Sequence, residues 1–230
     1  KLYIAVPAPF IKVRTKGQTL SFPKRRKITE AEIDVLFSSG LNELTENGRY
    51  VGCSAMYFSV GDNRRYFSRS DVLATKTALL QGALCYYFVN ENFYALTQKL
   101  FLSMGFTEIE YIPQSLAMAT YLLPAKTREG YAVILDVGDA ASVLLVAYGG
   151  GIVHQETFSC GVGQISAALM QEFGVDFDKA CEILAAADVS GGFVKKVNSY
   201  DRISKIATLS FFICRTLRFS LFRKYLKYLF

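Results

Sequence analysis

The chain has 230 residues, of which 51% are hydrophobic and 20% charged, enough apolar material for one large domain or two small ones. Its formal net charge is +6, but nine of its 26 Lys and Arg residues lie between Lys195 and Phe230, where the one acidic residue is Asp201. Residues 1–194 therefore carry 17 basic and 19 acidic residues, and this near-neutral balance argues against a nucleic-acid partner.

The cysteines and the apolar stretches narrow the class of protein further. The five cysteines form no Cys-x-x-Cys pair and no Cys/His cluster, which argues against a disulfide scaffold and a zinc site and favours a reducing cytoplasm. No run of about 18 uncharged apolar residues occurs. The sequence starts at Lys1-Leu2-Tyr3 without Met or a signal-peptide pattern, so we expect a fragment whose true start lies upstream.

The first 90 residues are predicted to form a compact α+β unit. Short strands are expected near the start of the chain. The basic run Lys24–Lys27 that follows them is expected to be a solvated loop. Thr29 and Glu32 have the spacing of a capping box, which predicts a helix with apolar residues at helical intervals. The expected strands are Leu2–Val6, Phe10–Val13, Thr19–Phe22, Tyr50–Val60, Arg65–Ser68 and Thr77–Val89.

Helices and strands alternate after residue 90. Asn90 or Asn92 is predicted to start a helix that ends near Gly105, and Pro113 suits the first turn of a further helix. Two more helices are expected near the end of this region, where Asp176 and Asp178 are predicted to cap or complement the second start. The expected elements are strand Phe106–Ile112 and helices Leu116–Leu123, Gln164–Phe173 and Phe177–Ala187.

Residues 131–163 are the most informative stretch. An apolar run ends in Asp136-Val137-Gly138, turns through Asp139-Ala140-Ala141, and returns as a second strand. The chain then reverses at Gly149–Gly151 and reaches Gly161-Val162-Gly163 before a helix. This order predicts a β-meander with a tight first turn.

No catalytic set is evident. His154 is the only histidine, and we expect it to have a structural role. No other histidine can complete a Ser/His/Asp or Cys/His catalytic set. There is no Walker-type loop and no GxGxxG motif, so Gly149–Gly151 is predicted to be a hairpin turn. Gly161-Val162-Gly163 is consistent with a tight strand-to-helix turn or with N–H groups that face an anion.

The order of these segments resembles the bacterial cell-division protein family FtsA. Leu135–Ala141, the glycine-rich hairpin and Gly161-x-Gly163-x-Ile165 resemble that family's second phosphate-binding segment and following helix. Tyr111–Ala117 resembles its approach to that segment, and residues 1–90 resemble its extra 1C domain, an SHS2-type module also found in PilM. The resemblance covers about residues 1–190. It implies an α/β and α+β fold: an actin-like (ribonuclease H-like) subdomain preceded by the 1C module.

By this resemblance the nucleotide-binding positions are Asp136, Gly138, Asp139, Ala140, Gly161 and Gly163. The family pattern is Asp-Ile-Gly-Gly-Gly-Thr, from which Asp139, Ala140 and Ala141 depart. A carboxylate at Asp139 repels a γ-phosphate, and Ala141 lacks a hydroxyl donor. We therefore expect weak binding of ATP with Mg²⁺, no hydrolysis, and neither catalytic residues nor a metal site.

The resemblance implies a division into a 1C-like module (1–90), a partial actin-like subdomain 2A (91–190) and an atypical basic, aromatic tail (191–230). It implies a cytoplasmic adaptor at the face of the cell membrane that assembles with itself and binds the tubulin-like FtsZ. A PilM-like pilus adaptor and an actin-fold ATPase or kinase are the alternatives. Charges surround the tail on a helical wheel, so a membrane contact through the C-terminus is poorly supported.

Overall fold

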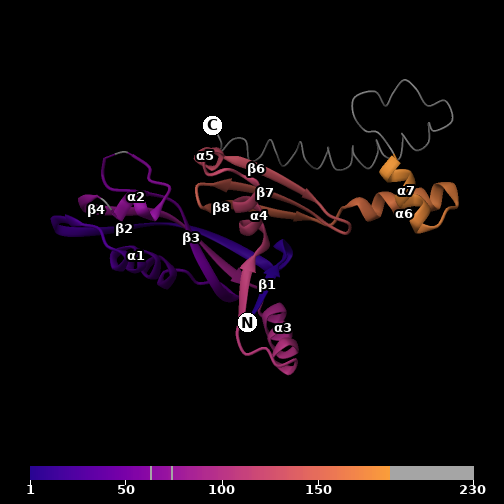
Figure 1. The fold of residues 1–230 in the computed structure, drawn as a ribbon, viewed down its shortest axis with the longest axis horizontal. Coiled ribbons are helices and arrows are strands. Elements are labelled where there is room, and N and C mark those ends of the chain that lie inside the picture. The colour runs from indigo at the N-terminus through magenta and orange to yellow at the C-terminus, as the bar shows by residue number, and fades with distance from the viewer. Residues whose placement is uncertain (63, 74, 187–230) are drawn as a thin grey trace, which may run out of the picture. The chain divides into compact units, whose positions relative to one another are not determined.

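The computed structural model describes residues 1–62, 64–73 and 75–186 (Figure 1). The predicted tail, 191–230, lies outside the described residues. The chain forms two compact units, one of Lys1–Leu135 with Val143–Thr157, the other of Asp136–Ser142 with the chain from Phe158 onward. The division at residue 90 stays a prediction.

A three-stranded antiparallel sheet dominates the first unit. Its order is β2 (Ile11–Lys27), β4 (Lys76–Val89), β3 (Arg49–Ser59). Helix α1 (Glu30–Asn42) packs against this sheet, and the short helix α2 (Arg69–Leu73) precedes β4. The predicted capping box is confirmed, because the Glu32 carboxylate accepts the Thr29 backbone N–H at 2.8 Å. The core between α1 and the sheet includes Ile33, Leu36, Leu80, Leu84 and Tyr86.

Strand β1 (Leu2–Val6) belongs to a different sheet. It pairs in parallel with β5 (Ile109–Pro113), with Leu2 opposite Ile109. The turn η1 (Ala8–Phe10) joins β1 to β2. Helix α3 (Glu91–Ser103) begins at Asn90, whose side chain accepts the N–H groups of Asn92 and Phe93, as the sequence indicated. Helices α4 (Gln114–Leu122) and α5 (Ala125–Arg128) follow β5.

The predicted β-meander is confirmed. Strands β6 (Ala132–Val137), β7 (Ser142–Tyr148) and β8 (Gly151–Phe158) are neighbours in that order (Figure 1). His154 lies in β8, with its Nε2 3.7 Å from the Glu156 carboxylate.

Glycines let the β7–β8 hairpin approach the backbone of β3. The Gly150 N–H donates to the Ala55 carbonyl at 3.1 Å, and a Cβ at Gly149 would lie 1.6 Å from the Met56 carbonyl oxygen. The Gly149 φ of +57° also suits glycine. The Arg128 guanidinium bonds the Gly149 carbonyl at 2.6 Å, which ties α5 to the same hairpin. The glycine run is a hairpin turn, as predicted. Because glycine has no side chain, this hairpin can pack closely against β3.

This packing gives the β2–β4–β3 sheet and the meander a shared core. Tyr87 and Cys85 of β4 are buried beside Ile152 of β8, and the Ile152 N–H donates to the Tyr87 hydroxyl at 3.3 Å. Burial raises the pKa of the Cys85 thiol to about 12. Residues before and after position 90 therefore fill this core together, while the core between α1 and the sheet is built from residues before position 90.

The second unit contains two helices after the meander. Helix α6 (Val162–Phe173) ends at Gly174, which has a φ of +63°. Asp176 caps α7 (Phe177–Ala186), because its carboxylate accepts the Lys179 N–H at 2.8 Å. Leu169 and Ala180 form the buried contact between these helices.

Three local expectations are corrected. The expected strands Phe10–Val13 and Thr19–Phe22 fall almost wholly within the single strand β2, because β4 pairs with it from Ile11 to Ser21 and again at Arg26 and Lys27, across an irregularity in the register. The run Lys24–Lys27, expected as a solvated loop, ends that strand, with Arg26 opposite Thr77. Arg65–Ser68 is no strand, and forms a single bridge between Tyr66 and Phe58.

Replacing Gly149 with Val tests the hairpin contact. The new side chain would collide with the Met56 carbonyl and would need a left-handed backbone conformation. We expect the free energy of unfolding to fall by more than about 2 kcal/mol, measured by chemical denaturation. Gly17→Ala is the control, because nothing lies within 4 Å of a Cβ there and φ is not positive. Equal stability of the two variants would contradict the packing argument.

The Glu46 carboxylate provides a pH-dependent contribution to stability. Hydrogen bonds from Lys12 (3.0 Å) and Arg14 hold its pKa below the ordinary 4.5. A lowered folded-state pKa stabilises the fold above the ordinary value, and this contribution is lost as the pH falls through the folded-state value. Glu46→Gln should flatten the stability profile below about pH 4.5. Urea unfolding at a series of pH values measures the free energy of unfolding of each variant, with Glu129→Gln as the control. Parallel pH profiles for Glu46→Gln and the unchanged chain would refute the contribution of Glu46.

Candidate functional site

The turn between β6 and β7 is closed by its own backbone. Strand β6 ends at Val137 and β7 begins at Ser142. The Gly138 N–H donates to the Ala141 carbonyl at 3.0 Å, so one N–H at the predicted phosphate turn is already used. The N–H groups at the start of α6, which face this turn, also have acceptors within the protein.

The start of α6 is bonded back to this turn. The Val162 N–H donates to the Gly138 carbonyl and the Gly163 N–H to the Asp139 carbonyl, each at 2.9 Å. The Gly161 N–H donates to the Gln164 side-chain oxygen at 2.6 Å. The first N–H groups of a helix are the donors that would face an anion. Three of these donors at α6 already have internal acceptors.

Gly161 and Gly163 are required by the closeness of this contact. A Cβ at Gly161 would lie 2.2 Å from the Asp139 carbonyl oxygen, and one at Gly163 would lie 2.6 Å from the Asp139 carboxylate. The Asp139 carboxylate therefore lies beside the N-terminus of α6, where the helix dipole favours negative charge. The site contains its own anion.

The structure brings together five of the six predicted nucleotide-binding positions: Gly138, Asp139, Ala140, Gly161 and Gly163. Asp136 lies one residue before the end of β6 and is half-buried. Sequence reasoning missed Gln164, which bonds Gly161 and also reaches the Ala140 carbonyl at 3.4 Å. Its signal was a Gln three residues after Gly161, the spacing of a capping box.

The chemistry of this site is limited. Within the described residues, no group of three or more His, Cys, Asp or Glu side chains is placed to hold a metal ion. The same part of the chain has no helix long and apolar enough to span a membrane. The turn can organise a backbone junction, and it presents a carboxylate where a phosphate would need donors.

A cavity with a mixed polar and apolar lining lies elsewhere, at the N-terminus of α3. Its volume is ≈220 Å³, and its lining residues come from η1, β2, the chain before β3, and the start of α3. The amide groups of Asn47, Asn90 and Asn92 offer both donors and acceptors. Lys12 and Glu91 add one charge of each sign, while Pro9, Phe10 and Gly48 complete the lining.

Comparison with known proteins identifies the fold. No protein-family model matches the chain, and no curated protein sequence matches it. Among solved structures, a chain of the PilM-PilN type IV pilus biogenesis complex aligns with a TM-score of 0.50 at 13% identity, over 97% of this chain and 59% of that one. The chain thus spans 59% of the length of that structure's chain.

Two further solved structures align less closely. The ethanolamine utilization protein EutJ from Carboxydothermus hydrogenoformans has a TM-score of 0.36 at 15% identity, over 53% of this chain and 39% of that one. A Bacteroides thetaiotaomicron protein with an actin-like ATPase fold has a TM-score of 0.28 at 11% identity, over 76% and 55%.

Gln164→Ala tests whether α6 is fastened to the turn. The Gly161 N–H would lose its acceptor, so its amide hydrogen exchange should accelerate and the unfolding free energy should fall by about 1 kcal/mol. Gln171→Ala, on the exposed side of the same helix, controls for helix propensity. Unchanged exchange at Gly161 would contradict the assigned hydrogen bond.

The chain therefore has a mixed α/β fold, as predicted, and this fold is similar to that of a chain of the PilM-PilN complex.

Proposed function

We propose that this chain is an actin-fold adaptor that binds other proteins and does not turn over nucleotide. The observation that carries this proposal is the internally bonded turn, in which the N–H groups of Gly138, Val162 and Gly163 donate to carbonyls. A nucleotide phosphate would have to break these bonds and displace the Asp139 carboxylate. Weak ATP binding and an absence of hydrolysis follow from both costs.

Between the two adaptor families, the PilM type has the stronger support. The PilM-PilN structure aligns with 97% of this chain, and a PilM-type protein would contain the SHS2-like module proposed for residues 1–90. The order of motifs from Leu135 to Ile165 supports the FtsA type, whose partners would be FtsZ and a second copy of the chain. In both cases the adaptor would act at the cytoplasmic face of the membrane.

The cavity at the start of α3 is the proposed binding position for a partner segment. An extended peptide exposes backbone donors and acceptors, which the amides of Asn47 and Asn92 complement. The side-chain oxygen of Asn90 is already used, because it accepts the N–H groups of Asn92 and Phe93 at the start of α3. A segment bound there would be held by hydrogen bonds on a preformed rim.

Calorimetric titration with Mg-ATP tests the nucleotide half of the proposal. The closed turn predicts no saturable heat at micromolar nucleotide and no phosphate release. A dissociation constant in the low micromolar range, about −8 kcal/mol, would contradict it. Such binding with hydrolysis would favour the ATPase or kinase alternative.

Pull-down of PilN-type and FtsZ-type proteins from the source cell tests the partner half. We expect the full chain to retain the PilN-type protein, and an Asn47→Ala/Asn92→Ala variant to retain several-fold less. Asn42→Ala, an exposed asparagine at the end of α1, is the matched control. Retention of the FtsZ-type protein instead would support the FtsA type, and retention of neither would refute the adaptor proposal.

A further inference from the structure

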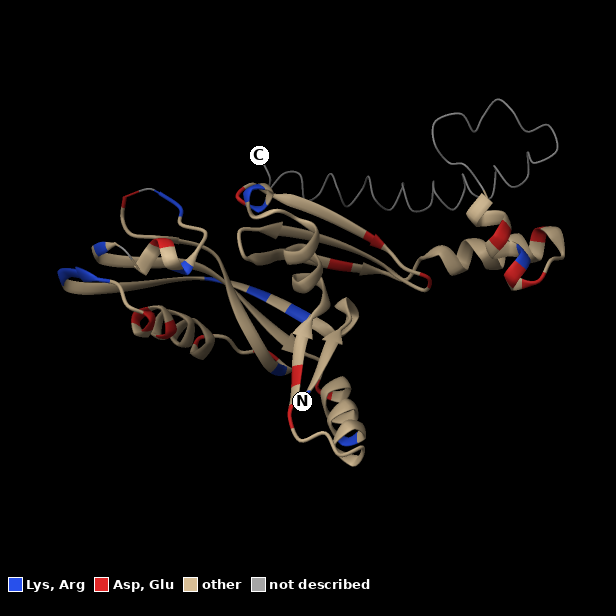
Figure 2. Cartoon of the chain, in the orientation of Figure 1, with Lys and Arg blue, Asp and Glu red and all other residues tan. Residues whose placement is uncertain are grey.

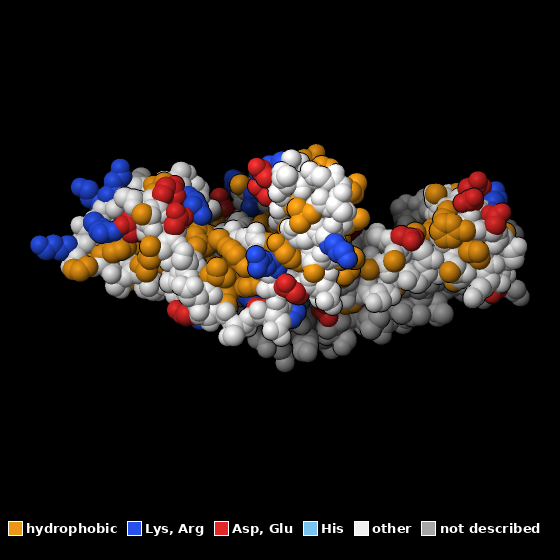
Figure 3. Space-filling view, turned by 90° about the horizontal axis from the view of Figure 1, so that it is seen from below, with side chains coloured by type: hydrophobic (Ala, Val, Ile, Leu, Met, Phe, Trp, Pro, Cys, Tyr) orange, Lys and Arg blue, Asp and Glu red, His pale blue; other side chains and the backbone are white. Residues whose placement is uncertain are grey.

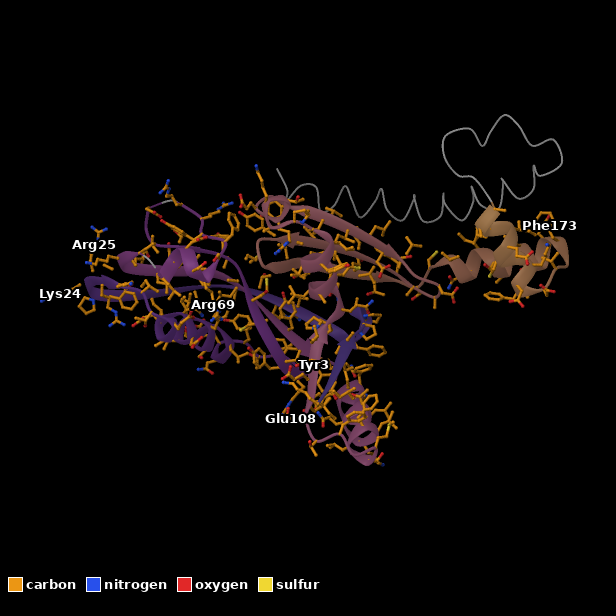
Figure 4. The ribbon with its side chains drawn as sticks, viewed as in Figure 1. Tyr3, Lys24, Arg25, Arg69, Glu108 and Phe173 are labelled. Carbon is orange, nitrogen blue, oxygen red and sulfur yellow. The ribbon has the colours of Figure 1, made fainter. Side chains whose placement is uncertain are left out.

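The end of the β2–β4 pair carries a dense group of cations. Strand β2 ends in Lys24-Arg25-Arg26-Lys27, and β4 begins at Lys76. Lys27 is directly opposite Lys76 in the antiparallel register. Figure 2 shows this blue end of the sheet, and in Figure 4 the side chains of Lys24 and Arg25 point away from it. We name Lys24, Arg25, Lys27 and Lys76 the basic end.

These four cations differ from the other basic residues of β2. Lys12 and Arg14 bond Glu46, and Lys16 is 2.8 Å from Glu43. Arg26 is paired with Glu32, and its guanidinium lies 4.7 Å above the Phe22 ring. The four residues of the basic end are exposed, and none has an ion pair among the described residues.

Strand pairing holds Lys27 and Lys76 opposite each other, whereas Lys24 and Arg25 lie in the irregular stretch of β2 between Ser21 and Arg26. Like charges directly opposite each other destabilise an antiparallel pair. The pairing is maintained by a buried neighbour, Thr77, whose hydroxyl bonds the Val60 and Leu79 carbonyls at 2.9 Å. Ile28, also buried, follows Lys27 and donates its N–H to Thr75 at 3.2 Å. The fold thus holds the like charges of Lys27 and Lys76 together, next to the exposed Lys24 and Arg25, and an anionic partner would compensate them.

We propose that the basic end docks on an anionic phospholipid surface. The cations lie at the free end of a sheet, and Figure 3 shows Lys and Arg side chains exposed at the left end of the view, where Figure 2 shows the blue end of the same sheet. Such an array matches an extended layer of headgroups, to which each Lys or Arg near the surface adds attraction. The neighbouring aromatic ring, Phe22, is covered by Arg26, which removes a stacking platform for nucleic-acid bases.

Vesicle binding by the full chain tests this inference. Co-sedimentation is measured with phosphatidylcholine vesicles with and without phosphatidylserine, at low and high salt. Lys24→Glu/Arg25→Glu should weaken binding to phosphatidylserine vesicles by about tenfold or more, since two attractive charges become repulsive. Lys99→Glu/Lys126→Glu is the matched control with the same change of net charge, at two exposed positions of α3 and α5, and should change binding less than about twofold.

The other outcomes overturn the proposal. Equal losses in both variants would show a response to net charge alone, and no loss in Lys24→Glu/Arg25→Glu would place the contact elsewhere. Duplex DNA that binds the full chain more tightly than phosphatidylserine vesicles would assign the basic end to nucleic acid. Circular dichroism establishes that each variant is folded, and the neutral Lys24→Gln/Arg25→Gln variant replaces the first if it is not. Failure here leaves the adaptor proposal standing, because that proposal rests on the turn and the cavity.

Discussion

The fold depends on a close backbone contact that only glycine permits. At the β7–β8 hairpin, Gly149 and Gly150 lie against the Met56 and Ala55 carbonyls of β3, with no space for a Cβ. This approach lets Tyr87 and Cys85 of one sheet share a core with Ile152 of the other. The three-stranded sheet, α5 and the meander are therefore stabilised together, and a single side chain at this hairpin would separate them.

A second close backbone contact that depends on glycine lies at the turn before β7. Gly161 and Gly163 bring the start of α6 against the Asp139 backbone and carboxylate. In a nucleotide-binding protein, glycines at such a junction let backbone N–H groups reach phosphate oxygens. Here the donors meet carbonyls and the anion is the protein's own side chain. A motif order typical of phosphate binding thus builds a closed junction, which is why we infer an adaptor.

Local signals predicted much of the fold. The Thr29–Glu32 capping box, the Asn90 cap and the apolar runs of the meander each depend on neighbouring residues, so sequence reasoning could find them. The length of β2 was missed because the polar, glycine-containing run Arg14–Gln18 interrupts its apolar pattern, while pairing with β4 continues the strand through that run. Likewise, the pairing of β1 with β5 and the role of Gln164 depend on residues brought together by the tertiary fold.

The N–H groups at the start of α6 donate to acceptors within the protein. Amide NMR shifts of Gly161, Val162 and Gly163, followed as Mg-ATP or pyrophosphate is added to the full chain, measure this directly. Because these donors are already bonded, we expect the three resonances to stay unchanged up to millimolar ligand, as do those of Gly138 and Ala141. Saturable shifts confined to these residues would show that a phosphate displaces the internal acceptors and would contradict the account.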